Sequence, residues 1–559
     1  MKIIFFGAAI LIVLIIVSIK SSIENREKNR QKLIKEFEGE LEREIEYTDY
    51  ENMKTYFYEM SKSWDNVIDD DTWNDLGMDD IFMKINNTNS SVGREYLYAM
   101  LRHPCTKPDE QKWLEDLINS FLNKPDERLK VQELFLELGY AKLIGVYRYI
   151  RNIVDFDTRS NRVHYLAQIF LVLSIFFALF ARPDIGVIAF ILAVAFTVIT
   201  YYREKARIDA YLTCVKWIAQ MICISKKLVS YKIDFLGDYS NKLNKLVASL
   251  KNIPKNIFLL VSASGMSGSL VEIALDYLRI FTHVDLIKFN GIVKEVKEKQ
   301  DEILEMYELL GKIEASIAVC AFRNRTKIWC VPELKTESSL LIKDGYHLIL
   351  SDPVANSIDA SRCVLLTGSN ASGKSTFLKT VAINAILAQT INTVAATKYV
   401  GECYRIVSSM SHRDDIINGD SYYMIEIKAL KRILDMEKNS KQRILCFLDE
   451  VLRGTNTVER IAASSQILKS FGCGRTLCFA ATHDIELTSL LKEWYDNYHF
   501  EESFENNDVK YNFILKTGPA VTRNAIKLLA QTGYDKNLID NAVKMTEVFE
   551  QEGVWKITI

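Results

Sequence analysis

A glycine-rich run from Gly368 to Ser375 joins two apolar stretches of this 559-residue chain and fits the pattern G-x-x-x-x-G-K-[S/T]. Residues 363–366 before it predict a buried strand, and residues 376–389 after it predict a helix. Such a loop points backbone N–H groups and the positive end of a helix dipole at one place, which favours a bound anion. We therefore expect an α/β domain with a phosphate-binding loop.

The loop residues have distinct expected roles in binding a nucleoside triphosphate. Lys374 is placed to reach the β- and γ-phosphates, and the hydroxyl of Ser375 is placed to hold Mg²⁺. A glycine-rich turn that matches by accident is the alternative, and the flanking strand and helix disfavour it. The predicted cofactors are ATP and Mg²⁺, and the predicted contacts are Gly368, Ser369, Asn370, Ala371, Ser372, Gly373, Lys374, Ser375 and Thr376.

Two further apolar runs end in polar residues that suit the same site. Residues 444–448 lead into Asp449, expected to hold Mg²⁺ through water, and Glu450, expected to act as the general base. Residues 476–480 lead into His483, which is placed to orient the γ-phosphate. A solvated strand tip and a structural histidine are the alternatives. Because ligands of α/β sheets bind at the carboxyl ends of the strands, we predict that these three side chains are catalytic.

Roughly residues 340–545 resemble the MutS family of ABC-type ATPases. The stretch D-E-V-L-R-G-T-N-T at 449–457 is similar to that family's extended Walker B motif, and residues 414–426 and 515–533 are similar to its middle and closing segments. The resemblance implies a homodimer with composite nucleotide sites, in which Ser421 of one subunit caps the nucleotide held by the other.

The resemblance continues more weakly upstream, where residues 87–104 look like the start of the family's helical core and residues 308–322 like the end of its lever helix. We therefore expect an α part followed by an α/β part. The expected domains are an anchor at 1–20, a charged helical linker at 21–79, a helical core and lever domain at 80–330 with a transmembrane hairpin at 163–202, and a P-loop ATPase domain at 331–559.

The family's mismatch-repair members carry a large N-terminal domain that inserts the phenylalanine of an F-x-E motif into the duplex. Fewer than ninety residues precede the expected core here, so we expect that domain to be missing. Phe57 does begin an F-x-E tripeptide, but Phe135 and Phe500 begin one too. One side of an ordinary helix is therefore the better interpretation of Phe57.

Three apolar stretches predict contact with a membrane. Residues 3–19 are followed by Lys20 and further basic residues, which indicates an uncleaved anchor with the following chain in the cytoplasm. A cleavable signal peptide is the alternative. Residues 163–181 and 185–202 are apolar on all faces with basic outer flanks, which predicts a transmembrane hairpin rather than a buried one. We expect a multi-pass protein of the plasma membrane, with lipids among its partners.

Charge and cysteine usage add weaker constraints. The net charge of −2 gives no global attraction to nucleic acid, but residues 203–255 hold eleven Lys and Arg against four Asp and Glu. Attraction to anionic lipid headgroups is the simpler explanation of this stretch. DNA phosphates would contact the same residues, and the sequence does not separate the two. Cys363, Cys446 and Cys478 lie in the predicted strands and suit the core of a protein in a reducing compartment.

The leading hypothesis is a membrane-anchored, MutS-like ATP hydrolase whose dimer closes on ATP and whose lever helices move the hairpin. A DNA-binding protein of mismatch repair or damage sensing is the first alternative. A transporter-type ATPase is disfavoured because no LSGGQ signature precedes Leu445. A purely structural scaffold is disfavoured because the expected catalytic residues are all present.

Overall fold

A computed structural model divides the chain into two compact units. The helical unit comprises Met1–Ser63, Ile85–Ala99 and Asp116–Arg325, and the sheet unit comprises Trp64–Lys84, Met100–Glu115 and Thr326–Ile559. The structure describes residues 20–21, 23–39, 47–141, 144–158, 160–180, 183–257, 270–337, 339–369, 372–410, 422–505, 508–520, 526, 529, 533–553, 555 and 557. The predicted anchor at 1–20 lies outside these residues except for Lys20.

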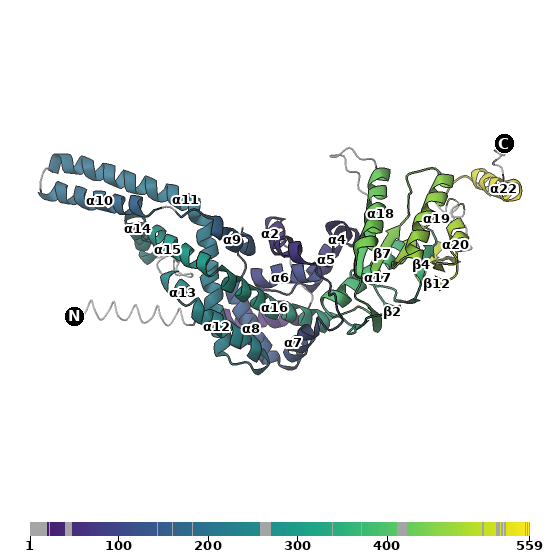
Figure 1. Ribbon diagram of the computed structural model, residues 1–559, viewed down its shortest axis with the longest axis horizontal. Helices are drawn as coiled ribbons and strands as arrows, with labels where there is room; N and C mark the ends of the chain where they lie inside the picture. Colours follow the sequence, from purple (N-terminus) through teal and green to yellow (C-terminus); the bar gives the residue numbers. More distant parts are fainter. Residues whose placement is uncertain are drawn as a thin grey trace. The chain divides into compact units, whose positions relative to one another are not determined.

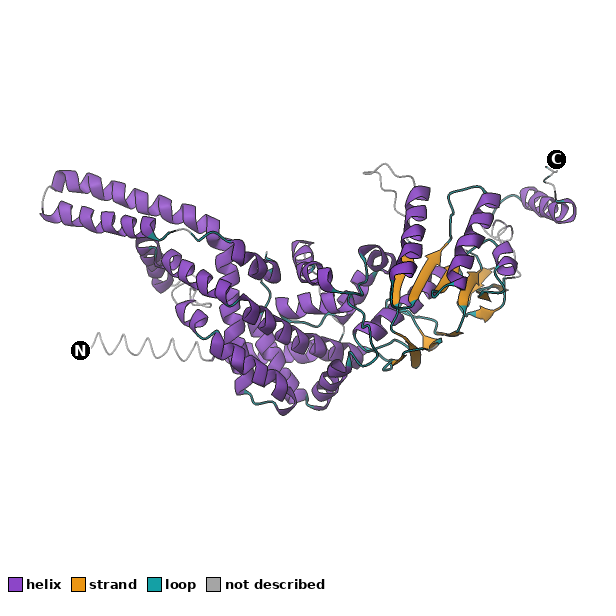
Figure 2. Ribbon diagram, viewed as in Figure 1, coloured by secondary structure: helices purple, strands orange, loops and turns teal. Residues whose placement is uncertain are grey.

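A six-stranded sheet forms the centre of the sheet unit (Figure 2). Its strands in spatial order are β12 (Lys516–Thr517), β9 (Tyr495–His499), β4 (Cys363–Thr367), β8 (Leu477–Ala481), β7 (Ile444–Asp449) and β6 (Arg405–Ser409). All neighbours pair in parallel except β12 with β9. Leu366 pairs with Ala481, and Ala481 pairs with Asp449, so the three predicted strands end side by side.

Helices cover the faces of this sheet, which is why its strands are continuous apolar runs. The helices are α17 (Lys374–Thr390), α18 (Tyr422–Asn439), α19 (Thr457–Cys473) and α20 (Glu486–Leu490). Leu430 and Ile433 of α18 and Leu468 of α19 share one buried cluster with Cys446 and Cys478. The prediction that the strand cysteines are core residues is confirmed, since Cys363 is buried as well.

Smaller elements complete the sheet unit. A four-stranded sheet has the order β1 (Glu333–Lys335), β5 (Lys398–Glu402), β2 (Leu340–Gly345) and β3 (Asn356–Ala360), and β10 (Glu502–Glu505) pairs with β11 (Asp508–Tyr511). Two helices from early in the chain, α4 (Asp70–Leu76) and α5 (Met78–Ile85), pack here too. The carboxylate of Asp75 accepts hydrogen bonds from the Ser408 hydroxyl at 2.7 Å and the Met410 N–H at 2.8 Å, which fixes α4 beside β6. The helix α22 (Lys536–Glu552) lies near the end of the chain.

The helical unit is built around α16 (Gln300–Arg325), which lies among the other helices of the unit in Figure 1. Most residues of α16 are buried. Glycine lets α6 (Ser91–Leu101) approach it closely, because a Cβ on Gly311 would lie 2.7 Å from the Tyr96 side chain. Around them lie α2 (Tyr47–Met53), α3 (Thr55–Met60), α7 (Lys112–Asn123), α8 (Pro125–Leu138), α9 (Val146–Asn152), α12 (Gly237–Ser249), α13 (Asn252–Ile257), α14 (Leu270–Thr282) and α15 (Val284–Glu298). Phe57 is buried in α3 against Tyr98, which agrees with its interpretation as one side of a helix.

The predicted hairpin corresponds to α10 (Arg162–Phe180) and α11 (Pro183–Ser230), which lie side by side in Figure 1. The second span was expected to end at Tyr202, but α11 continues to Ser230 as one helix of 48 residues. At 1.5 Å per residue this helix is about 70 Å long. The apolar hairpin is therefore continuous with a helix that also packs against α8, α12 and α15 of the same unit.

Candidate nucleotide site

The run from Gly368 to Gly373 forms a loop between β4 and α17, in the expected strand–loop–helix arrangement. Gly368 has φ 138° and Gly373 has φ 105°, a region that side chains rarely adopt. A Cβ on Gly368 would also lie 2.7 Å from the carbonyl oxygen of Phe500. Glycine is thus required at both positions. Asn370 and Ala371 lie outside the described residues.

Lys374 is the first residue of α17, and its buried amine lies within the loop. The amine donates hydrogen bonds to the carbonyl oxygens of Gly368 at 2.8 Å and Ser369 at 2.7 Å. Burial lowers the pKa of Lys374 to about 8, although the nearby carboxylates of Asp449 and Glu450 favour its charged form. The loop carbonyls are neutral, whereas a bound phosphate would supply a negative charge to pair with the Lys374 amine. Ser375 and Thr376 follow in the first turn of α17.

The end of β7 brings Asp449 and Glu450 beside the end of β8. The backbone N–H of Glu450 donates to the Ala481 carbonyl at 3.0 Å, and the Nε2 of His483 lies 2.8 Å from the Glu450 Oε1. Burial and the charge of Lys374 lower the pKa of His483 despite the neighbouring glutamate. His483 is therefore neutral near pH 7, with its Nε2–H donated to the carboxylate.

Sequence reasoning did not assign roles to the arginines around this glutamate. Arg453 forms an ion pair with the Glu450 Oε2 at 2.9 Å, and Arg460 forms one with Asp484 at 2.6 Å. These side chains, with Val451, Thr482 and His483, line a cavity of about 120 Å³. Arg453 belongs to the R-G-T-N-T stretch noted in the sequence, so that motif was the available signal.

A second cavity of about 330 Å³ adjoins the loop and contains residues that sequence reasoning missed. Gly373 and Thr376 form part of its wall, so it opens beside the expected phosphate position. The remaining wall is largely apolar and aromatic and includes His347, Pro353, Val354, Phe377, Phe500 and Phe513. These residues come from separate segments and share no motif. The cavity has the size and chemistry to accept a flat heterocyclic base.

The structure brings together Lys374, Asp449, Glu450 and His483 at one edge of the sheet. Ser421 was predicted to cap a partner's nucleotide, but it lies within residues 411–421, outside the described part of the chain.

Comparison with known proteins places this site in context. Residues 364–550, which span the site, match the family model MutS domain V. The chain is 28% identical over 282 residues to the DNA mismatch repair protein MutS of Lawsonia intracellularis, an alignment covering 47% of this chain and 31% of that protein. It is 30% identical over 273 residues to the MutS of Thermotoga maritima, covering 46% and 33%. Part of this chain, including the nucleotide site, is therefore similar to MutS proteins.

The similarity to MutS proteins covers part of each chain. The alignments to the two MutS proteins cover about a third of their length, so their DNA repair activity does not transfer to this chain directly. The MutS domain V match begins at Val364, one residue into β4, and extends into α22. It therefore includes the loop, both carboxylates and His483.

Proposed function

We propose that this protein is a membrane-anchored ATPase of the MutS type that uses ATP binding and hydrolysis to close and open a homodimer. The observation that carries the proposal is the meeting of Lys374, Asp449, Glu450 and His483 at the carboxyl ends of adjacent strands. A cation, two acids and a neutral histidine around a glycine loop suit phosphoryl transfer to water.

The residues of the nucleotide site suit separate parts of an ATP–Mg²⁺ complex. The loop N–H groups and Lys374 would bind the phosphates, and the wall that includes Phe500 and Phe513 would take the base. Ser375 and Asp449 supply the oxygen ligands that Mg²⁺ prefers, and the bound ion would neutralise charge on the phosphates. Glu450 would accept a proton from the attacking water.

His483 would hold the carboxylate of Glu450 in the orientation needed for that proton transfer. Its Nε2–H contacts one carboxylate oxygen, and Arg453 contacts the other. Since Arg453 is 61% exposed at its side chain, it can leave the carboxylate when a nucleotide enters. Release of Arg453 would free one oxygen of Glu450 to act as the base.

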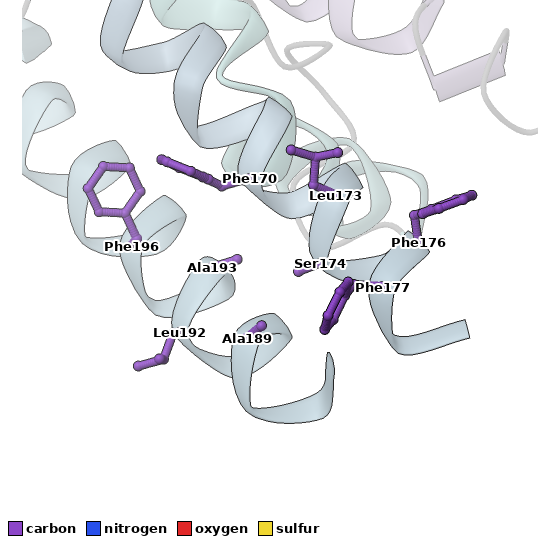
Figure 3. Close-up of a pocket in the computed structure, with 9 residues that line it drawn as sticks. All are labelled: Phe170, Leu173, Ser174, Phe176, Phe177, Ala189, Leu192, Ala193 and Phe196. Carbon is purple, nitrogen blue, oxygen red and sulfur yellow. The ribbon is translucent and has the colours of Figure 1, made fainter. Parts of the chain in front are cut away.

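The membrane part of the proposal is supported by the composition of the hairpin surface. Arg162–Phe180 and Pro183–Ser230 are long enough to cross a membrane, and each contains an apolar window of 18 residues, with mean hydropathies of 2.1 and 2.3 over these windows. Only 17% of each apolar window is buried, whereas the core helix of a soluble protein would be mostly buried. Large side chains face outward, with Phe176 60% and Leu192 65% exposed (Figure 3).

Small side chains instead lie between the two hairpin helices. Ser174 and Ala193 are buried there, and a Cβ on Gly186 would lie 2.2 Å from the Cα of Ala178. Small residues at a close helix contact and large apolar residues outside are typical of membrane helices, because lipid drives no burial of large side chains. With basic residues at both outer ends, the ATPase would lie in the cytoplasm at the plasma membrane.

The first test is nucleotide trapping by detergent-solubilised Glu450→Gln protein. We expect this variant to bind ATP and remain dimeric with turnover reduced on the order of 100-fold or more, since it lacks the general base. The control is Glu493→Gln, which neutralises an exposed glutamate after α20 and should hydrolyse ATP normally. Hydrolysis by Glu450→Gln at the rate of the unmodified protein would refute the catalytic assignment.

DNA binding is the second candidate function, favoured by the names of the MutS relatives and by the basic stretch at 203–255. Lys226 and Lys227 on α11 and Lys251 after α12 are exposed in that stretch. The ATP-bound Glu450→Gln protein should be tested against matched and mismatched duplexes at two salt concentrations. Tight binding that weakens steeply with salt would support contacts to DNA phosphates. Absence of binding would favour a function at the membrane over DNA binding.

A further inference from the structure

The segment that follows the catalytic glutamate has a backbone conformation unusual for its residues. Glu450 has φ 54° and Leu452 has φ 59°, both in the left-handed region that favours glycine. Neither residue would hold this conformation without outside contacts, because a side chain in that region crowds the following carbonyl. The position of the Glu450 carboxylate therefore depends on what fixes residues 450–452.

Each of these three residues is tied to a different element. The N–H of Glu450 donates to Ala481 at the end of β8, and the carbonyl of Val451 accepts from the Ser464 hydroxyl of α19 at 3.1 Å. The N–H of Leu452 donates to the carboxylate of Glu426, in the second turn of α18. Glu426 is thus the side chain that connects the strained residue to α18.

The placement of Glu426 is unusual for a carboxylate. Glu426, Leu430 and Ile433 occupy positions i, i+4 and i+7 of α18, so Glu426 lies on the helix face that packs into the core. Glu426 is 4% exposed. Burying a carboxylate is costly unless hydrogen bonds compensate for lost water. The strained N–H of Leu452 supplies such a bond, so the two unfavourable features stabilise each other.

We propose that Glu426 is a positioning residue for ATP hydrolysis, holding Leu452 left-handed and thereby aiming the Glu450 carboxylate. This inference rests on the proposed ATPase function and adds a residue to that same site. Glu426 itself does not touch the reacting atoms; it acts through the backbone of residues 450–452.

Glu437 provides a matched control on the same helix. Its Oε1 accepts hydrogen bonds from the Arg475 N–H and the Thr476 hydroxyl, both at 2.8 Å, at the start of β8 and away from the carboxyl ends of the strands. Glu437→Ala therefore removes a glutamate of α18 that accepts a backbone N–H, but leaves residues 450–452 untouched. It reports what a purely structural loss on α18 does to the enzyme.

The experiment compares steady-state ATP hydrolysis by full-length Glu426→Ala, Glu426→Gln and Glu437→Ala. For Glu426→Ala we expect kcat to fall by up to about 100-fold with an unchanged KM, because a small displacement of a catalytic group has an effect of that size. Glu426→Gln retains a carbonyl oxygen that can accept the Leu452 N–H, so it should keep most of the turnover. Glu437→Ala should keep both constants.

The inference is overturned if Glu426→Ala turns over normally, if Glu426→Gln is as impaired as Glu426→Ala, or if only KM changes. Should Glu450→Gln also hydrolyse ATP normally, the proposed function itself fails. If Glu450→Gln is inactive while Glu426→Ala is fully active, the proposed role of Glu426 is refuted and the proposed ATPase function stands.

Discussion

The carboxylate of Glu450 is held at both oxygens, and this determines what can activate it. His483 donates to one oxygen, and Arg453 pairs with the other. With one oxygen bonded to His483 and the other paired with Arg453, the carboxylate has an oxygen free to meet an attacking water only after Arg453 leaves. We therefore expect ATP hydrolysis to require that a bound nucleotide draw Arg453 away from Glu450.

Lys374 gives a prediction at the same scale, concerning pH. Its pKa is lowered by burial to about 8, below its ordinary value near 10.5, whereas bound phosphates would favour the charged amine. Between pH values of about 8 and 10.5, Lys374 is mostly neutral in the free protein. ATP binding in this pH range should therefore be accompanied by uptake of a proton on Lys374. Affinity should be constant below pH 8 and fall by up to about tenfold per pH unit above it.

Calorimetry of ATP binding to Glu450→Gln protein, in two buffers of different ionisation heat, measures this proton uptake. The comparison variant is Lys374→Arg, in which the guanidinium stays charged across the range and the pH dependence should disappear. A flat profile in protein that retains Lys374 would show that its amine does not face the phosphates.

At the scale of elements, α11 joins the apolar hairpin to the helical unit without a break. Two separate features of the sequence, an apolar run and a charged continuation, form one helix from Pro183 to Ser230. A rigid helix moves as a unit. Displacement of the C-terminal half of α11 by α8, α12 or α15 would therefore also displace the hairpin. Continuity of α11 is the structural basis for expecting lever motion to reach the membrane.

Two glycine-to-alanine changes in the helical unit should have opposite effects, because Gly186 lies at the close contact between α10 and α11 and Gly291 does not. Gly186→Ala should destabilise the helical unit by about 1–3 kcal/mol, because its Cβ would lie 2.2 Å from the Cα of Ala178. Gly291→Ala in α15 meets open space and should stabilise by roughly 0.5–1 kcal/mol through helix propensity. Thermal unfolding in detergent measures both, and equal effects would contradict the described hairpin contact.

For the whole molecule, two kinds of surface coexist in one chain. A nucleotide site of polar and charged residues is set in one unit, and an exposed apolar hairpin projects from a helix of the other. An exposed apolar surface of this extent marks a membrane or a partner protein. The membrane assignment makes a prediction that the ATPase assignment does not.

A chain lacking residues 1–19 should stay in the membrane pellet after a carbonate wash at high pH, because the hairpin alone would anchor it. The same truncated chain with Leu173 and Leu192 changed to lysine should move toward the supernatant, since a charge on the lipid face of a span costs about 2.5–3.5 kcal/mol. Release of the truncated chain without these changes would assign the hairpin to a protein partner instead.

The positions of the strands and of the loop helix were predictable from the sequence. Predicted runs at 363–366, 444–448 and 476–480 correspond to β4, β7 and β8, and the predicted helix at 376–389 corresponds to α17. The strands and the helix were predicted from apolar periodicity, and the loop from Gly368 and Gly373. Both signals are local properties of the sequence. The grouping of Lys374, Asp449 and His483 followed because parallel strands end at one edge of a sheet.

Other features were decided only by packing between distant segments. The base-sized cavity joins His347, Phe377 and Phe513, which share no motif, and α4 joins the sheet unit through Asp75. Glu426 carried a local signal, a charge on an apolar helix face, but its partner Leu452 is identified only by the fold. Local sequence encodes backbone conformation and element type, whereas the contacts between elements depend on how their surfaces meet, which no short stretch of chain specifies.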